Sequence, residues 1–178
     1  MGDQHNRDRY GELWDQERIA VCLGEIEALK DGVILSGGWA WHFMSPIGHK
    51  ELKHAHDHKD IDIFVNPLDV SRVCSSLKRR GFERVWTRYD RLPSKEDFRR
   101  YELLHGKTRV VVDFFVKDVP SIDVQGFQVV EPRTLLSLYR NIHSSDKCFA
   151  VQAASRLIAA GENPVGRSEL VEIPQGSR

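Results

Sequence analysis

Three aspartates lie in two apolar stretches of the chain, where a carboxylate needs a partner. Asp60 and Asp62 are separated by one residue at the start of one stretch, and Asp113 interrupts the run of valines and phenylalanines at 110–116. Both stretches have the composition of β-strands, in which alternate side chains point to the same face. Asp60 and Asp62 therefore share a face and repel each other unless a cation lies between them. Oxygen ligands suit Mg²⁺ or Mn²⁺, and Mg²⁺ commonly binds one or two carboxylates together with substrate phosphates.

A glycine turn precedes the first of these stretches. Ser36, Gly37 and Gly38 follow the apolar run 33–35 and open a segment of helical character. Glycine allows backbone N–H groups to approach a phosphate closely, and the positive N-terminus of a following helix favours an anion. A Gly-Gly pair alone is a common turn. Its place between a strand and a helix, with the acids following, favours a phosphate-binding site to which Ser36 adds a hydroxyl.

These pieces together resemble a known family. The segment Gly37-Gly38-Trp39-Ala40, followed by His58-x-Asp60-Ile61-Asp62-Ile63, resembles the nucleotidyltransferases of the DNA polymerase β superfamily. The resemblance is to the small aminoglycoside and lincosamide nucleotidyltransferases and to abortive-infection, toxin-like proteins. It covers residues 30–117 and, more weakly, 131–160, with Asp113 as the third acid of the family on a later strand.

The resemblance implies transfer of a nucleoside monophosphate from an NTP to a hydroxyl acceptor, with release of pyrophosphate. Two divalent ions, Mg²⁺ or Mn²⁺, would be bound by Asp60, Asp62 and Asp113, which are also the expected catalytic residues. Asp113 would contact the ion on the acceptor side and serve as general base. The expected nucleotide contacts are Ser36, Gly37, Gly38, His58 and Lys147.

Two positions depart from the family pattern. The arginine that members carry two residues before the site histidine is replaced by His56, and a Lys-Asp pair is reversed as Asp146-Lys147. His56 belongs to a polar, histidine-rich segment, residues 47–59, which we interpret as a loop inserted at the rim of the site. A zinc site on His49, His54, His56 and His58 is the alternative interpretation; the last three share one face only if the segment is extended.

The pattern of apolar residues predicts an α+β fold, a mixed β-sheet flanked by helices, with further helices at the C-terminus. Residues 1–161 form a single nucleotidyltransferase domain with its catalytic core at 10–130 and helices at 131–161, followed by a loose tail at 162–178. The predicted helices are 10–30, 39–44, 67–80, 132–142 and 147–160. The predicted strands are 33–35, 60–65, 82–89, 98–104, 108–116 and 126–130, with 98–104 and 108–116 paired as a hairpin.

Charge and composition limit the partners. The 26 basic and 26 acidic residues balance, which argues against a protein that coats nucleic acid. The chain has no apolar run of membrane-spanning length and no signal-like N-terminus, and its three cysteines are scattered, so we expect a cytoplasmic location without a membrane partner. Arg79, Arg80, Arg99 and Arg100 are interpreted as solvated residues, which would favour an RNA acceptor only if they lined one groove.

The acceptor remains open between a small molecule, such as an antibiotic, and RNA. A toxin-like enzyme that modifies tRNA or protein is an alternative, and a homodimer that completes the site would suit so short a chain. A second class of function is a catalytically weak nucleotide-binding module of the same fold. A third is a metal sensor built on the histidine-rich loop.

Overall fold

A computed structural model of the chain describes residues 16–44, 59–92 and 97–141, together with 150–152, 154–155 and 158–159. The helices within these ranges are α2 (Gln16–Leu29), α3 (Gly37–Met44), α4 (Val70–Arg79), the 3-10 helix η1 (Arg88–Arg91) and α5 (Pro132–Arg140). The strands are β1 (Ile34–Leu35), β2 (Ile61–Val65), β3 (Glu83–Val85), β4 (Phe98–His105), β5 (Thr108–Val116), β6 (Ser121–Val124) and β7 (Phe127–Val130).

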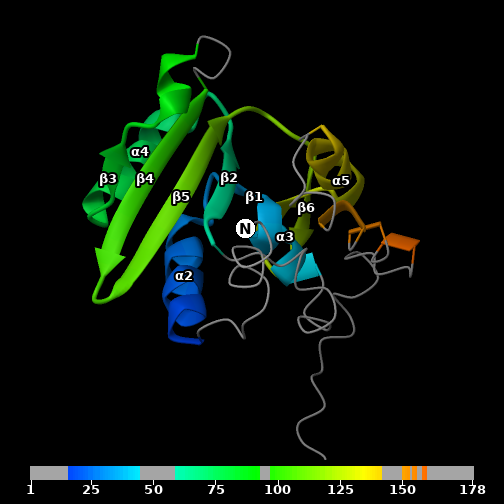
Figure 1. Cartoon of the computed structure of the whole chain (residues 1–178), viewed down its shortest axis with the longest axis horizontal. Coiled ribbons are helices and arrows are strands. Elements are labelled where there is room, and N and C mark those ends of the chain that lie inside the picture. Colours follow the sequence, from blue (N-terminus) through cyan, green and yellow to red (C-terminus); the bar gives the residue numbers. More distant parts are fainter. Residues whose placement is uncertain are drawn as a thin grey trace, which may run out of the picture.

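The strands form one mixed sheet of seven, in the order β3-β4-β5-β2-β1-β7-β6 (Figure 1). β2 pairs in parallel with β5, and β1 pairs in parallel with β7, whereas the other neighbours are antiparallel. The two acid-bearing strands, β2 and β5, are therefore hydrogen-bonded neighbours at the centre of the sheet. The predicted mixed sheet flanked by helices is confirmed.

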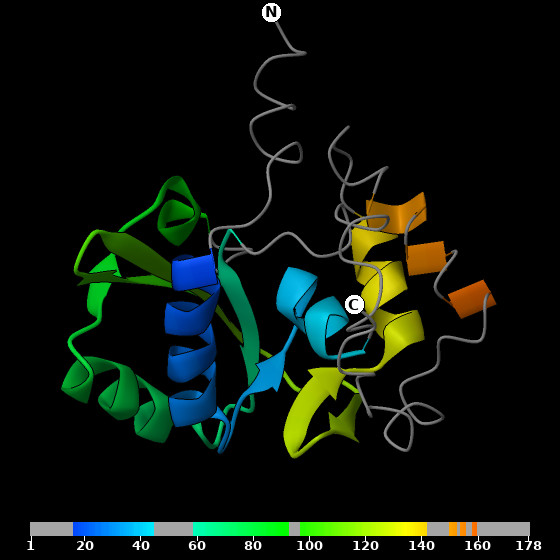
Figure 2. The same ribbon diagram turned by 90° about the horizontal axis from the view of Figure 1, so that it is seen from below.

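The two faces of the central strands differ in character. On β5, Val110, Val112 and Phe114 are fully buried on one face, while Asp113 and Phe115 point to the other. The helix α2 contacts both β5 and α4 (Figure 2). These helices cover the apolar face, because side chains of α4 reach the β4 residues that lie on it. Asp113 lies on the opposite face of the sheet, which α2 and α4 do not cover.

Several element boundaries differ from the sequence prediction, most of them by one or two residues. The helix α4 starts at Val70 and not at residue 67, because the Asn66 side chain accepts a hydrogen bond from Leu68 N (3.0 Å) and forms a turn. The predicted strand 82–89 ends at Val85, since a capping box between Thr87 and Asp90 starts η1.

The helix α3 also begins earlier than predicted, at Gly37, so that the glycine pair forms its first turn. A strand that was not predicted, β6, pairs with β7 across a turn at Gln125 and Gly126. Both residues of this turn have positive φ, at 58° and 82°, as a tight hairpin requires.

The predicted hairpin of β4 and β5 is confirmed. The domain limit at residue 161 and the tail lie outside the described residues and stay predictions. Among the described helices, none combines the length and the apolar character of a membrane span.

Candidate functional site

The register of the central strands brings the predicted acids together. Asp62 of β2 is paired directly with Asp113 of β5. Asp60 lies in the bend before β2. It belongs to the same face as Asp62, because every second side chain of an extended chain points to the same face. We call Asp60, Asp62 and Asp113 the carboxylate row. Asp113 is only 7% exposed, so its negative charge needs compensation within the protein.

The glycine turn packs against the same row. Ser36 is buried, and its N–H donates to the Asp62 carbonyl oxygen at 2.8 Å. Gly37 has a φ of +60°, and a Cβ added there would overlap Asp62 Oδ2 and lie 3.1 Å from its Cγ. Only glycine fits at this position, because any side chain would collide with the Asp62 carboxylate. The sequence motif and the carboxylate row are thus one site, with the first turn of α3 beside Asp62.

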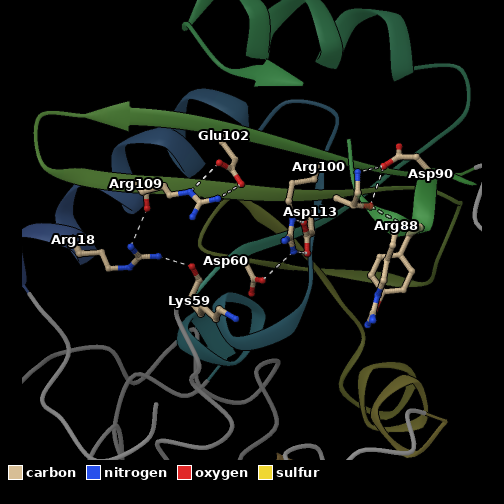
Figure 3. Close-up of polar contacts among 11 residues, drawn as sticks. Arg18, Lys59, Asp60, Arg88, Asp90, Arg100, Glu102, Arg109 and Asp113 are labelled. Carbon is tan, nitrogen blue, oxygen red and sulfur yellow. Dashed lines mark hydrogen bonds and ion pairs between the residues drawn. The ribbon is translucent and has the colours of Figure 1, made fainter. Parts of the chain in front are cut away.

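Arg100 of β4 is part of this site, which the sequence analysis missed. Its Nε and Nη2 donate to the two carboxylate oxygens of Asp113, each at 2.7 Å, and Nη2 also lies 3.7 Å from Asp60 Oδ2 (Figure 3). Hydrogen bonding to Asp113 raises the pKa of Arg100, against the lowering effect of its partial burial. The interpretation of Arg100 as a solvated residue is therefore wrong. The predicted hairpin, with residues 105–107 as its turn, would have paired Arg100 with Val112. The observed turn is one residue shorter, since His105 pairs with Thr108, and this register pairs Arg100 with Asp113.

A second set of contacts fixes the ends of the acid-bearing strands. The Arg18 guanidinium of α2 donates to the backbone oxygens of Arg109 (2.9 Å) and Lys59, at the entrances to β5 and β2 (Figure 3). The Arg109 side chain forms a two-point ion pair with Glu102 of β4. These contacts link α2, β2, β5 and β4 beside the carboxylate row and hold it in register.

Aromatic rings continue the acidic face one step further along the strands. Phe64, Phe115 and Phe98 follow one another with centroid separations of 5.3 Å, and Tyr89 of η1 stacks edge-on against Phe98 at 5.7 Å. The Arg88 guanidinium lies 5.0 Å from the Tyr89 ring centroid. Phe64 and Phe98 are buried, so this aromatic cluster packs the end of the sheet next to the carboxylates, with the Arg88–Tyr89 pair at its border.

The other arginines that could have lined a nucleic-acid groove are dispersed. Arg80 pairs with buried Glu25 of α2, and Arg99 contacts Cys74 (3.3 Å) and stacks on Phe114, on the face opposite the carboxylate row. These residues do not share one surface with Arg100. His58, Lys147 and the histidine-rich loop lie outside the described residues, so their roles stay predictions.

The donor set fits a divalent cation in one part of the row. Asp60 and Asp62 supply the hard oxygen ligands that Mg²⁺ and Mn²⁺ prefer, beside the cradle at Gly37 that a Cβ would fill. Both oxygens of Asp113 are engaged by Arg100. Within residues 16–44, 59–92, 97–141 and the short C-terminal pieces, no three histidine, cysteine or acidic side chains converge as a metal-binding group. The residues present therefore fit an ion held by Asp60 and Asp62.

Comparison with known proteins gives the fold. No protein-family model and no curated protein matches the chain. Among solved structures, the antibiotic-resistance factor ANT(2'')-Ia has a TM-score of 0.51 at 12% identity, over 86% of this chain and 89% of its own.

Two further solved structures have TM-scores of 0.48. The lincosamide antibiotic adenylyltransferase LnuA, bound to lincomycin, is 14% identical over 81% of this chain and 98% of its own. The Megavirus polyadenylate synthase is 16% identical over 79% of this chain and 31% of its own. At 12% identity the likeness to ANT(2'')-Ia shows a shared fold, an α+β fold with a mixed sheet flanked by helices, as the sequence predicts.

Proposed function

We propose that this protein is a metal-dependent nucleotidyltransferase, which moves a nucleoside monophosphate from an NTP to a hydroxyl acceptor. The observation that carries the proposal is the pairing of Asp62 with Asp113 on parallel strands, with Gly37 packed against Asp62. Three acidic side chains gathered beside a glycine turn, one of them buried and two partly buried, are costly to build for stability alone, and they suit a site where cations and a triphosphate supply positive charge.

Each residue has a defined role in the proposed reaction. Asp60 and Asp62 would hold the divalent cation, which would supply positive charge to the triphosphate and the leaving pyrophosphate. The Ser36 hydroxyl and the backbone N–H groups of Gly37 and Gly38, at the positive end of α3, bind phosphate oxygens. His58 and Lys147 are further proposed nucleotide contacts.

The chemistry is an in-line displacement. The acceptor oxygen forms a bond to the α-phosphorus as the bond from that phosphorus to the bridging oxygen breaks, and pyrophosphate leaves. The acceptor proton passes toward the Asp113 carboxylate, whose charge Arg100 balances. Most of the rate enhancement then comes from positioning and charge neutralisation.

The distribution of positive charge favours a small acceptor over RNA. A nucleic-acid acceptor needs cations that are available for its phosphates. In the described part of the chain, Arg72, Arg80, Arg84, Arg100 and Arg109 each form an ion pair with an acidic side chain of the same protein. Together with the balanced net charge, this supports a hydroxyl-bearing small molecule as the substrate.

The test is pyrophosphate release by the full chain with each NTP, Mg²⁺ and a panel of aminoglycoside and lincosamide acceptors, with cell RNA and protein as parallel arms. We expect Asp60→Asn and Asp62→Asn to reduce turnover about a hundredfold or more. Asp118→Asn, which changes an exposed acid beyond the end of β5, is the matched control and should keep wild-type turnover.

Pyrophosphate release only in the arms with RNA or protein would overturn the small-molecule acceptor and leave the proposed nucleotidyl transfer in place. Nucleotide binding without pyrophosphate release from any mixture would identify the catalytically weak binding module. The Arg100–Asp113 pair is the observation that favours that alternative, since it engages the third acid.

A further inference from the structure

Arg100 places a positive charge inside the carboxylate row itself. Its guanidinium is bonded to both oxygens of Asp113 and stands 3.7 Å from Asp60, so it lies between two of the three acids (Figure 3). The direct pairing of Arg100 with Asp113 across β4 and β5 fixes both backbones. This position follows from the hairpin register and does not depend on a flexible loop.

The two-point bond limits what else Asp113 can bind. A carboxylate meets a guanidinium fork with both oxygens, in the geometry that makes such pairs strong and specific. A divalent ion on Asp113 has to displace hydrogen bonds that are 2.7 Å long, or bind next to a fixed like charge. Displacement would also leave the guanidinium, whose side chain is only 32% exposed, without its partner.

We propose that Arg100 is a positioning residue that takes the place of a second, acceptor-side metal ion. It keeps Asp113 neutralised and oriented, and the site accepts a single divalent ion, which Asp60 and Asp62 hold. This inference rests on the proposed function. It replaces the two-ion site that the family resemblance implies with a site that holds one ion and the Arg100 guanidinium. The positive charge on the acceptor side is then permanent and independent of metal concentration.

The experiment counts ions rather than turnover. The full chain is titrated with Mn²⁺ alone, and free Mn²⁺ is measured by electron paramagnetic resonance. Wild type is expected to bind one ion, and Arg100→Gln is expected to gain a second site because Asp113 is released. Arg99→Gln is the matched control, since it removes the neighbouring cation of β4, which lies on the opposite face of the sheet and contacts Cys74 and Phe114.

Each outcome decides the proposal. Two ions in wild type, or no change in stoichiometry in Arg100→Gln, overturns the role of Arg100. In either of these cases, loss of Mn²⁺ binding in Asp62→Asn would still support the proposed metal site on Asp60 and Asp62. Absence of binding in wild type overturns both.

Folding of the variants is checked by circular dichroism. If Arg100→Gln does not fold, Arg100→Lys replaces it. A lysine keeps the charge but cannot bond both oxygens at once, so we expect a weak second site. A stoichiometry that remains at the wild-type value in Arg100→Lys overturns the proposal.

Discussion

Gly37→Ala is the substitution that tests most directly whether the glycine turn and the carboxylate row form one site. Gly37 has a φ of +60°, and a Cβ at this position would overlap Asp62 Oδ2. The carboxylate cannot simply rotate away, because the new Cβ would also lie 3.3 Å from Asp62 Cβ. The substitution must therefore move α3 or displace Asp62.

The chain offers a control that separates backbone strain from this clash. Gly106, in the turn between β4 and β5, also has a φ of +60°, but a Cβ there meets no atom within 4 Å. Gly106→Ala should cost only the left-handed backbone strain, about 1–2 kcal/mol. Gly37→Ala should add an overpacking cost of about 1–3 kcal/mol, for a total loss of about 2–5 kcal/mol.

Urea unfolding followed by circular dichroism measures both free energies, and pyrophosphate release measures the site. We expect Gly106→Ala to keep wild-type turnover and Gly37→Ala to lose most of it at a temperature where the protein is still folded. If both variants lose the same free energy of unfolding and Gly37→Ala keeps its turnover, the close approach to Asp62 has no role in the site. The reasoning about the cradle would then be wrong.

Three further predictions concern groups away from the proposed chemistry. Arg80→Gln removes the hydrogen-bond partner of the Glu25 carboxylate, and Glu25 is only 5% exposed. We expect it to lower the free energy of unfolding by about 1–3 kcal/mol. Arg79→Gln, at an exposed neighbouring position, is the control and should change that free energy by less than about 0.5 kcal/mol. A backbone N–H bond at the start of η1 lowers the pKa of Asp90 below its ordinary value of 3.8, so Asp90→Asn should be destabilising at neutral pH. This stabilisation is complete above the ordinary pKa and is lost as the pH falls through the lowered pKa of Asp90. The difference in free energy of unfolding between Asp90→Asn and wild type should therefore vanish in acid. A difference that persists in unfolding curves at acid pH would contradict the assignment. Burial raises the pKa of the Cys22 thiol, so iodoacetamide should modify it only after denaturation, as peptide mass spectrometry can show.

Local patterns in the sequence were sufficient for most elements. The alternation in β2 and β5, the symmetric hairpin of β4 and β5, and the glycine pair before a helix depend on neighbours a few residues apart, so each could be read from the chain. The same patterns identified Asp60, Asp62 and Asp113 as candidates. They did not give β6, because its turn at Gln125 and Gly126 places a non-glycine residue at positive φ.

Only the tertiary structure decided how the candidates meet. The pairing of Asp62 with Asp113 joins strands that are about fifty residues apart, and such a register depends on how the whole core packs. The contact of Gly37 with the Asp62 carboxylate and the placement of Arg100 between two acids follow from that packing. Sequence alone determined which side chains could carry charge, and the long-range register determined which charges neutralise one another, because Coulomb interactions depend on distance in space and not along the chain.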